Sequence, residues 1–289
     1  QFGHDNKMGS SVVFCSTHEL RPAGSWAKWQ YYLGASNGTV AQLLARTSAN
    51  AEVWTHTVTA GATIGTPAVL ADSSIIFGYS NFGTNLTKLG TNGVAQFENN
   101  ISQITALTIG QDGTTYFTAS GDKIVAIKPD GTQKWLTYKD GLAGYAPVIL
   151  DDGKIYLTSR LSGTPNFYSF DAQTGQFLWS KTMSNNSPTC CGVSDISYDS
   201  ANDYLYAAAD QYILKIDRNG TNLEQFVADR QVGWGYTSTM ISQDTNNLIF
   251  GLDFSINNPA SQSAVYAVNK STKEVSWKYT VNSRINKQI

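Results

Sequence analysis

Short apolar runs separated by turn-forming residues recur along the whole chain. In one clear stretch, residues 114–119 and 123–127 are apolar or β-branched, residues 129–131 read Pro-Asp-Gly, and Trp135 follows. Runs of this length and composition are typical of strands, and Asp-Gly pairs are typical of the tight turns between them. We find no amphipathic helix of useful length. The pattern therefore predicts antiparallel strands joined by short turns.

The same order of runs and turns occurs six times, and each copy ends in a tryptophan or a phenylalanine. The intervals between these aromatic residues run from 38 to 51 residues. Their mean of about 45 matches the repeat of a four-stranded propeller blade. The terminal aromatic residues are Trp54, Phe97, Trp135, Trp179, Phe226 and Trp277.

These repeats predict an all-β chain that forms a single β-propeller domain over residues 1–289. Six four-stranded blades are expected, and seven is the alternative, because residues 281–289 either extend the last strand or begin another blade. Each blade buries its faces against its neighbours, so no domain boundary is expected inside the array. The expected blades are residues 10–58, 59–99, 100–139, 140–183, 184–229 and 230–281.

One repeat end carries a family resemblance. Residues 171–179 read Asp-Ala-Gln-Thr-Gly-Gln-Phe-Leu-Trp, residues 269–277 are a weaker copy, and residues 2–10 look like the opening of secreted members. The chain thereby resembles the PQQ-like (quinoprotein-type) β-propeller repeat family. The resemblance implies that each terminal aromatic ring docks its blade against the next. It does not settle function, because this repeat serves both enzymes and binding scaffolds.

The adjacent residues Cys190 and Cys191, followed by Gly192, are similar to a feature of PQQ-dependent alcohol dehydrogenases. There a vicinal disulfide lies against the cofactor, so the resemblance implies a Cys190–Cys191 disulfide and PQQ with calcium. The alternative is a purely structural disulfide or two buried thiols. Those enzymes have about twice this length, and we cannot assemble their calcium ligands here. Cys15 is expected to be a buried thiol, with a disulfide to Cys190, to Cys191 or to another chain as the alternatives.

The remaining chemistry is sparse. Charged residues are 15% of the chain and the net charge is −2, which argues against nucleic-acid binding. No apolar run approaches the roughly 18 residues of a membrane-spanning helix. His4, His18 and His56 lack metal-ligand spacing, and no serine nucleophile elbow occurs. We therefore assign no catalytic, cofactor-binding or metal-binding residues, and we interpret the Asp-Gly pairs as turns rather than calcium loops.

The chain begins at Gln1 without an apolar leader, as expected either of a mature secreted protein or of a cloned or proteolytic fragment. Asparagine glycosylation motifs are slightly more numerous than chance predicts, which favours an extracellular glycoprotein. These motifs begin at Asn37, Asn85, Asn100, Asn185, Asn219 and Asn269.

The sequence therefore favours a non-enzymatic, exported scaffold that binds a protein or glycan partner or assembles with copies of itself. One alternative is a PQQ-dependent alcohol-type dehydrogenase. The other is a lectin-like carbohydrate binder, for which Trp234 and Tyr236 are the candidate binding face because aromatic rings stack on sugars or peptides.

Overall fold

The computed structural model describes most of the predicted strands and turns. The described residues are 9–15, 30–36, 41–47, 51–58, 63–65, 67–80, 84–101, 104–119, 122–142, 146–161, 164–182, 196–209, 212–221, 224–227, 235–237, 242–254 and 263–281. The chain divides into two compact units, one of residues 1–120 with 124–136 and one of residues 121–123 with 137–289. We describe each unit by itself.

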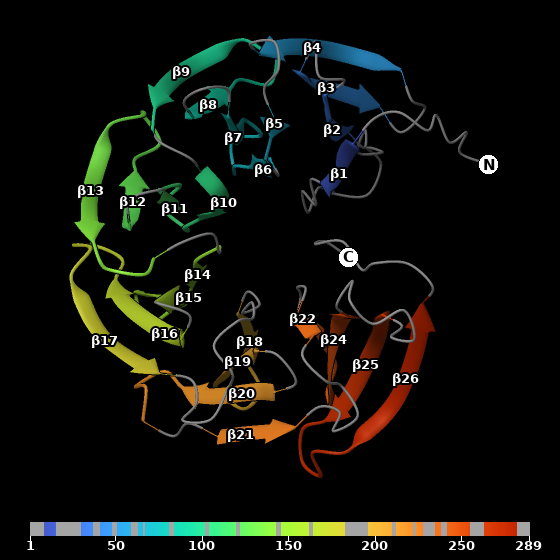
Figure 1. The fold of residues 1–289 in the computed structure, drawn as a ribbon. Helices are drawn as coiled ribbons and strands as arrows, with labels where there is room; N and C mark the ends of the chain where they lie inside the picture. Colours follow the sequence, from blue (N-terminus) through green and yellow to red (C-terminus); the bar gives the residue numbers. More distant parts are fainter. Residues whose placement is uncertain are drawn as a thin grey trace, which may run out of the picture. The chain divides into compact units, whose positions relative to one another are not determined.

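Three sheets belong wholly or mostly to the first unit, and in each the strands follow one another in chain order (Figure 1). The first sheet contains β1 (Gly9–Cys15), β2 (Gln30–Ser36), β3 (Ala41–Thr47) and β4 (Glu52–Val58). The second contains β5 (Thr63–Ile64), β6 (Ala68–Val69), β7 (Ile75–Ser80), β8 (Thr84–Leu89) and β9 (Ala95–Asn100). The third contains β10 (Ile104–Ile109), β11 (Thr115–Ala119), β12 (Lys123–Ile127) and β13 (Gln133–Tyr138).

Three further sheets belong to the second unit. The fourth contains β14 (Val148–Ile149), β15 (Lys154–Leu161), β16 (Thr164–Asp171) and β17 (Phe177–Thr182). The fifth contains β18 (Ser197–Asp199), β19 (Tyr204–Ala209), β20 (Tyr212–Asp217) and β21 (Glu224–Val227). The sixth contains β22 (Gly235–Thr237), β23 (Ser242–Gln243), β24 (Asn247–Phe254), β25 (Ser263–Asn269) and β26 (Val275–Val281).

Every element in the described residues is a strand, which confirms the predicted all-β class. The predicted runs at residues 114–119 and 123–127 form β11 and β12. Two sheets differ from the simple four-stranded pattern, because their first strand is split into two short segments, β5 with β6 and β22 with β23. The six described sheets fit the predicted six blades.

The Asp-Gly turns hold their shape through the aspartate side chain. Asp130 accepts hydrogen bonds from the Thr132 backbone N–H at 2.9 Å and from its hydroxyl at 2.7 Å, and Gly131 between them has a φ of 88°. These bonds lower the pKa of Asp130. This arrangement is an Asx turn, in which the side-chain oxygen of Asp or Asn accepts a hydrogen bond from the backbone N–H two residues later. Equivalent bonds are made by Asp72, Asn92, Asp112, Asp152, Asp199, Asp217, Asp244 and Asn269.

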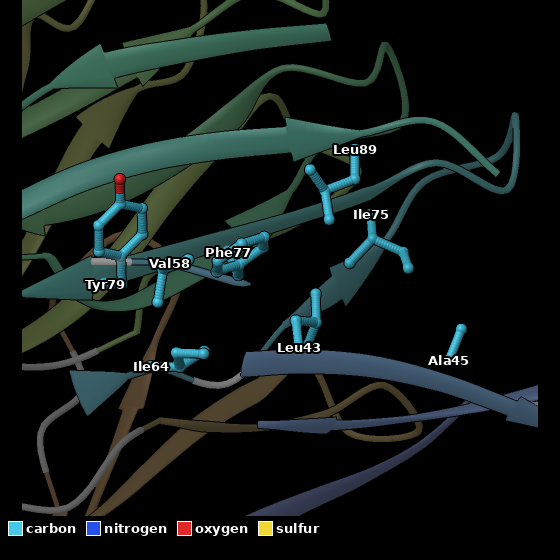
Figure 2. Packing of buried hydrophobic residues seen from close by; sticks show 8 residues of the cluster. All are labelled: Leu43, Ala45, Val58, Ile64, Ile75, Phe77, Tyr79 and Leu89. Carbon is cyan, nitrogen blue, oxygen red and sulfur yellow. The ribbon is translucent and has the colours of Figure 1, made fainter. Parts of the chain in front are cut away.

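The hydrophobic core lies between successive sheets. Figure 2 shows Leu43 and Ala45 of the first sheet facing Ile75, Phe77 and Leu89 of the second. In the second unit, one cluster joins the fourth and fifth sheets and another joins the fifth and sixth. The middle strands therefore carry apolar residues on both faces, as expected for sheets that are covered on both sides.

A buried ion pair also joins the fifth and sixth sheets. Lys270 donates to the carboxylate of Asp199 at 2.9 Å, and their side chains are only 9% and 4% exposed. Asn202 donates to the same carboxylate at 3.0 Å. Burial alone would raise the pKa of Asp199, but the hydrogen bonds from Lys270 and Asn202 outweigh it and lower that pKa. The pair therefore stabilises the fold above the ordinary aspartate pKa, and this contribution is lost as the pH falls through the lowered value.

We predict that Lys270→Met lowers the free energy of unfolding by about 3–5 kcal/mol at pH 7, because Asp199 becomes a buried charge without its partner. The loss should shrink toward pH 3, where protonation removes that charge. Urea denaturation at several pH values measures both effects. The double variant Lys270→Met/Asp199→Asn is the control and should be more stable at pH 7 than Lys270→Met alone. A loss that is the same at both pH values would contradict this account.

Candidate interaction surface

The last strand of each sheet carries the predicted terminal aromatic residue, and in the first, second, fourth and sixth sheets a β-bulge precedes it, whereas β21 of the fifth sheet pairs with β20 in regular register. In β4, Trp54 pairs with Ala45, whereas Glu52 pairs with the next residue of β3, Arg46, so one residue is left over. Such a bulge changes where the following side chain points. The second, fourth and sixth sheets have the same irregularity. The extra residues are Val53, Gln96, Leu178 and Ser276.

Three of the predicted rings lie directly on a glycine in a turn of the following sheet. A Cβ atom at Gly93 would lie 2.7 Å from the ring of Trp54, and one at Gly220 would lie 2.7 Å from Trp179. Phe97 covers Gly131 at the same distance. These glycines have φ values of 76°, 74° and 88°, which other residues rarely adopt. Both the ring and the backbone conformation therefore require glycine.

The carbonyl two residues before each of these glycines accepts a hydrogen bond from the preceding sheet. The indole N–H of Trp54 donates to the Thr91 carbonyl at 3.0 Å. Phe97 has no donor, and there the Lys88 ammonium donates to the Pro129 carbonyl at 3.3 Å. At the third junction the Tyr156 hydroxyl lies 3.2 Å from the Arg218 carbonyl, but it shares its single proton with the closer carboxylate of Asp152 at 2.6 Å. The buried indole N–H of Trp179 has no hydrogen-bond partner within the described part of the chain.

A second polar contact accompanies the ring. Asn99, two residues after Phe97, donates to the Gly131 carbonyl at 2.6 Å. Thr137, two residues after Trp135, donates to the Gly175 carbonyl at 2.7 Å. At the second junction, β9 thus contacts the glycine turn through both a ring and a polar side chain.

The structure describes the surroundings of the other three predicted rings to different extents. Trp135 is nearly buried, and its ring centroid lies 5.7 Å from that of Tyr116. Trp277 in β26 is 44% exposed. Phe226 belongs to β21, and its side chain is outside the description. The docking role of all six rings stays a prediction.

Arg218 anchors the densest group of charges. Its guanidinium donates to Asp151 at 2.6 Å and also bonds Asp203 and the Tyr198 hydroxyl. Burial opposes its charge, but these bonds raise the pKa of Arg218 overall. Tyr156, whose hydroxyl donates to Asp152 at 2.6 Å, has its pKa raised by burial and by that bond. The group links turns of the fourth and fifth sheets.

The pKa shifts of the described side chains all point away from neutrality: the pKa values of tyrosines and of Arg218 are raised, and those of aspartates are lowered. Burial raises the pKa of Tyr206 to about 12, and hydrogen bonds lower the pKa of Asp244. Each shift moves a group further from neutrality, whereas a general acid or base needs a pKa near the working pH. The shifted groups are Asp72, Tyr79, Asp112, Asp130, Tyr156, Tyr168, Tyr198, Asp199, Asp203, Tyr206, Arg218 and Asp244.

Several predicted site residues are not described. Tyr236 lies in β22 and Cys15 in β1, but nothing is known of their side chains. Those wholly outside the described residues are His4, His18, Asn37, Asn185, Cys190, Cys191 and Trp234. The vicinal disulfide and the aromatic binding face therefore stay predictions. Across the part of the chain that the structure describes, no three His, Cys, Asp or Glu side chains form a metal-binding group, and no helix could span a membrane.

The exposed large apolar side chains of the described residues gather on the last strands or directly beside them. Leu178 and Val53 are the extra residues of two bulges and are 40% and 44% exposed, and Tyr138 at the end of β13 is 67% exposed. We call these seven the last-strand residues: Val53, Val94, Tyr138, Leu178, Val275, Trp277 and Tyr279. The sequence analysis missed most of them, although a residue directly before a terminal aromatic residue could have been recognised as a bulge position.

Comparison with known proteins agrees with this geometry. Residues 36–279 match the PQQ-type family model whose description is "Outer membrane protein assembly factor BamB". The chain belongs to this family. The match confirms the PQQ-like resemblance. No curated protein sequence matches the chain.

Solved structures show that the PQQ-type chain has a β-propeller fold. BamB from Moraxella catarrhalis superposes with a TM-score of 0.65 at 15% identity, over 95% of this chain and 80% of that one. The C-terminal WD40 domain of Sif2 gives 0.62 at 14% identity, over 86% and 69%. The quinohemoprotein alcohol dehydrogenase ADHIIG from Pseudomonas putida HK5 gives 0.55 at 11% identity, over 75% and 42%. At these identities the likeness concerns the fold alone.

The different donors at the junctions predict unequal effects of one substitution. Trp54→Phe removes the hydrogen bond to the Thr91 carbonyl, whereas Trp179→Phe removes a buried N–H that has no described partner. The exposed hydrogen bond of Trp54 contributes about 0.5–1.5 kcal/mol, whereas removing the unpaired buried N–H of Trp179 relieves a cost of about 1–3 kcal/mol. The Trp54 variant should therefore lose at least about 1 kcal/mol more unfolding free energy than the Trp179 variant. Urea denaturation of both proteins measures the difference. Equal losses, or a larger loss for Trp179→Phe, would contradict the assigned junction bonds.

Proposed function

We propose that this PQQ-type propeller is an exported, non-enzymatic scaffold that binds another protein through the last-strand residues of its second unit, Tyr138, Leu178, Val275, Trp277 and Tyr279. The observation that carries the proposal is the exposure of Tyr138, Leu178 and their counterparts on the last strands. Exposed apolar side chains, and aromatic ones above all, are enriched where proteins bind each other. The matched family is described as an assembly factor, which also supports a protein-binding role.

The state of the ionisable groups also supports a scaffold. The turn aspartates are engaged by backbone N–H groups, as Asp130 is by Thr132. The Arg218 group is closed on itself by ion pairs and hydrogen bonds. Groups used in this way maintain turns and sheet junctions and are not available for proton transfer.

A protein partner explains the exposed residues better than a glycan does. Exposed aliphatic side chains such as Leu178 and Val275 offer apolar area but no hydrogen bonds, whereas sugar recognition relies on polar groups together with stacked rings. Tyr138 adds an aromatic ring, with the Lys123 ammonium 5.5 Å from its centroid. The proposed surface is thus mainly apolar with an aromatic contribution.

The test is chemical cross-linking of the tagged full chain in the culture medium of the cells that naturally produce it. Mass spectrometry then identifies the cross-linked proteins. With the double variant Tyr138→Ser/Leu178→Ser, the yield of the proteins that cross-link to the unmodified chain should fall at least about tenfold. The melting temperature of the variant should stay unchanged. Gln96→Ala is the matched control, because Gln96 occupies the same bulge position as Leu178 but is polar. Recovery of the same proteins at the same yield from the double variant would refute the proposed surface.

The dehydrogenase alternative has a direct test of its own. It rests on the predicted Cys190–Cys191 disulfide and on the fold likeness to ADHIIG. We expect purified protein incubated with PQQ and calcium to show no dye-linked alcohol oxidation. Oxidation above the level of heat-denatured protein would replace the scaffold proposal with the enzyme.

A further inference from the structure

Two glycosylation motifs face each other across one strand pair. Asn85 of β8 pairs directly with Asn100 of β9, and each begins an Asn-x-Ser/Thr motif. The two asparagines therefore lie at the same level of one sheet. Their surroundings nevertheless differ, because Asn100 is exposed whereas Asn85 is only partly so.

The polar groups of the Asn85 motif are already used inside the sheet. The Asn85 amide donates to the Tyr79 hydroxyl at 2.8 Å, and that hydroxyl donates to Glu98 at 2.8 Å. Thr87, the third residue of the motif, is fully buried and donates to Glu98 at 3.2 Å. An oligosaccharide is attached to the amide nitrogen, so it would have to displace this network and stand where Tyr79 packs.

The situation at Asn219 resembles that at Asn100. Asn219 begins the motif Asn219-Gly220-Thr221 in the turn between β20 and β21, and both Asn219 and Thr221 are exposed. Gly220 gives the turn its positive φ of 74°, and Asp217 holds the turn through the backbone N–H groups of Asn219 and Thr221. The asparagine side chain therefore stands on a fixed turn with its amide toward solvent.

We infer that an asparagine-linked oligosaccharide is carried by Asn100 and Asn219 in the folded protein and not by Asn85. The inference rests on the proposed export, because such sugars are added in the secretory pathway. It also restricts the partner surface. A glycan at Asn100 covers the end of β9, and one at Asn219 covers the turn in front of β21. Neither residue lies on β13, where Tyr138 is exposed.

The experiment uses the full chain secreted by a eukaryotic host from the host's own signal peptide, so its result does not depend on natural export or on partner binding. The folded secreted protein is treated with N-glycosidase in ¹⁸O water, and the peptides are mapped by mass spectrometry. Peptides with Asn100 and Asn219 should carry the label, and the peptide with Asn85 should not. A sample without enzyme is required, because the Asn219-Gly220 pair deamidates unaided.

Two kinds of variant complete the test. Asn100→Gln and Asn219→Gln should each reduce the mass of the secreted protein by one glycan. Asn85→Gln should leave the glycan mass unchanged and lower the melting temperature, because the Tyr79 hydroxyl loses the Asn85 donor and keeps only its bond to Glu98. Thr87→Ser keeps the motif and the hydroxyl and should also leave the glycan mass unchanged. Labelling of Asn85, or no labelling of Asn100 or Asn219, would overturn the inference.

Discussion

The contact between an aromatic ring on one sheet and a glycine turn on the next is the constraint on which the rest of this fold depends. Each sheet of short strands leaves two apolar faces, which must be covered by its neighbours. The ring fixes how two sheets meet, because Gly93, Gly131 and Gly220 allow it to lie directly on the backbone. The bulge before Trp54 and its counterparts positions the ring. A regular strand would change the register at this position.

The junctions differ in chemistry while keeping the same geometry. The turn carbonyl accepts a hydrogen bond from an indole at one junction and from an ammonium at another, Trp54 and Lys88, and at the third it lies beside the Tyr156 phenol, whose proton is shared with Asp152. The requirement is a donor at that place and not a particular residue. This explains how a phenylalanine at position 97 is tolerated: its cross-strand neighbour Lys88 makes the bond that the ring cannot.

Local patterns predicted much of this fold, because strands and turns are encoded by neighbouring residues. The runs at residues 114–119 and 123–127, the Asp-Gly turns and the spacing of the terminal aromatic residues all have local physical causes. The donors could not be predicted in this way, since Tyr156 and the Arg218 carbonyl meet only after two sheets pack. The exposure of Leu178 depends on a bulge, and its place directly before Trp179 is the one sequence signal for that bulge. The chemistry expected of Cys190, Cys191 and Trp234 stays a prediction.

If the ring and the glycine form one packing unit, substitutions at both should be strongly coupled. The decisive measurement is a double-mutant cycle of Trp54→Ala and Gly93→Ala by urea denaturation, with Gly153→Ala as control. Gly153 has a similar φ of 72°, but a Cβ atom there meets nothing within 4 Å. Gly93→Ala should lose about 1–2 kcal/mol from backbone strain, as the control does, and about 1–3 kcal/mol more from overlap with the ring. In the Trp54→Ala background only the strain should remain, a coupling of about 1–3 kcal/mol. Additivity within about 0.5 kcal/mol would contradict the account.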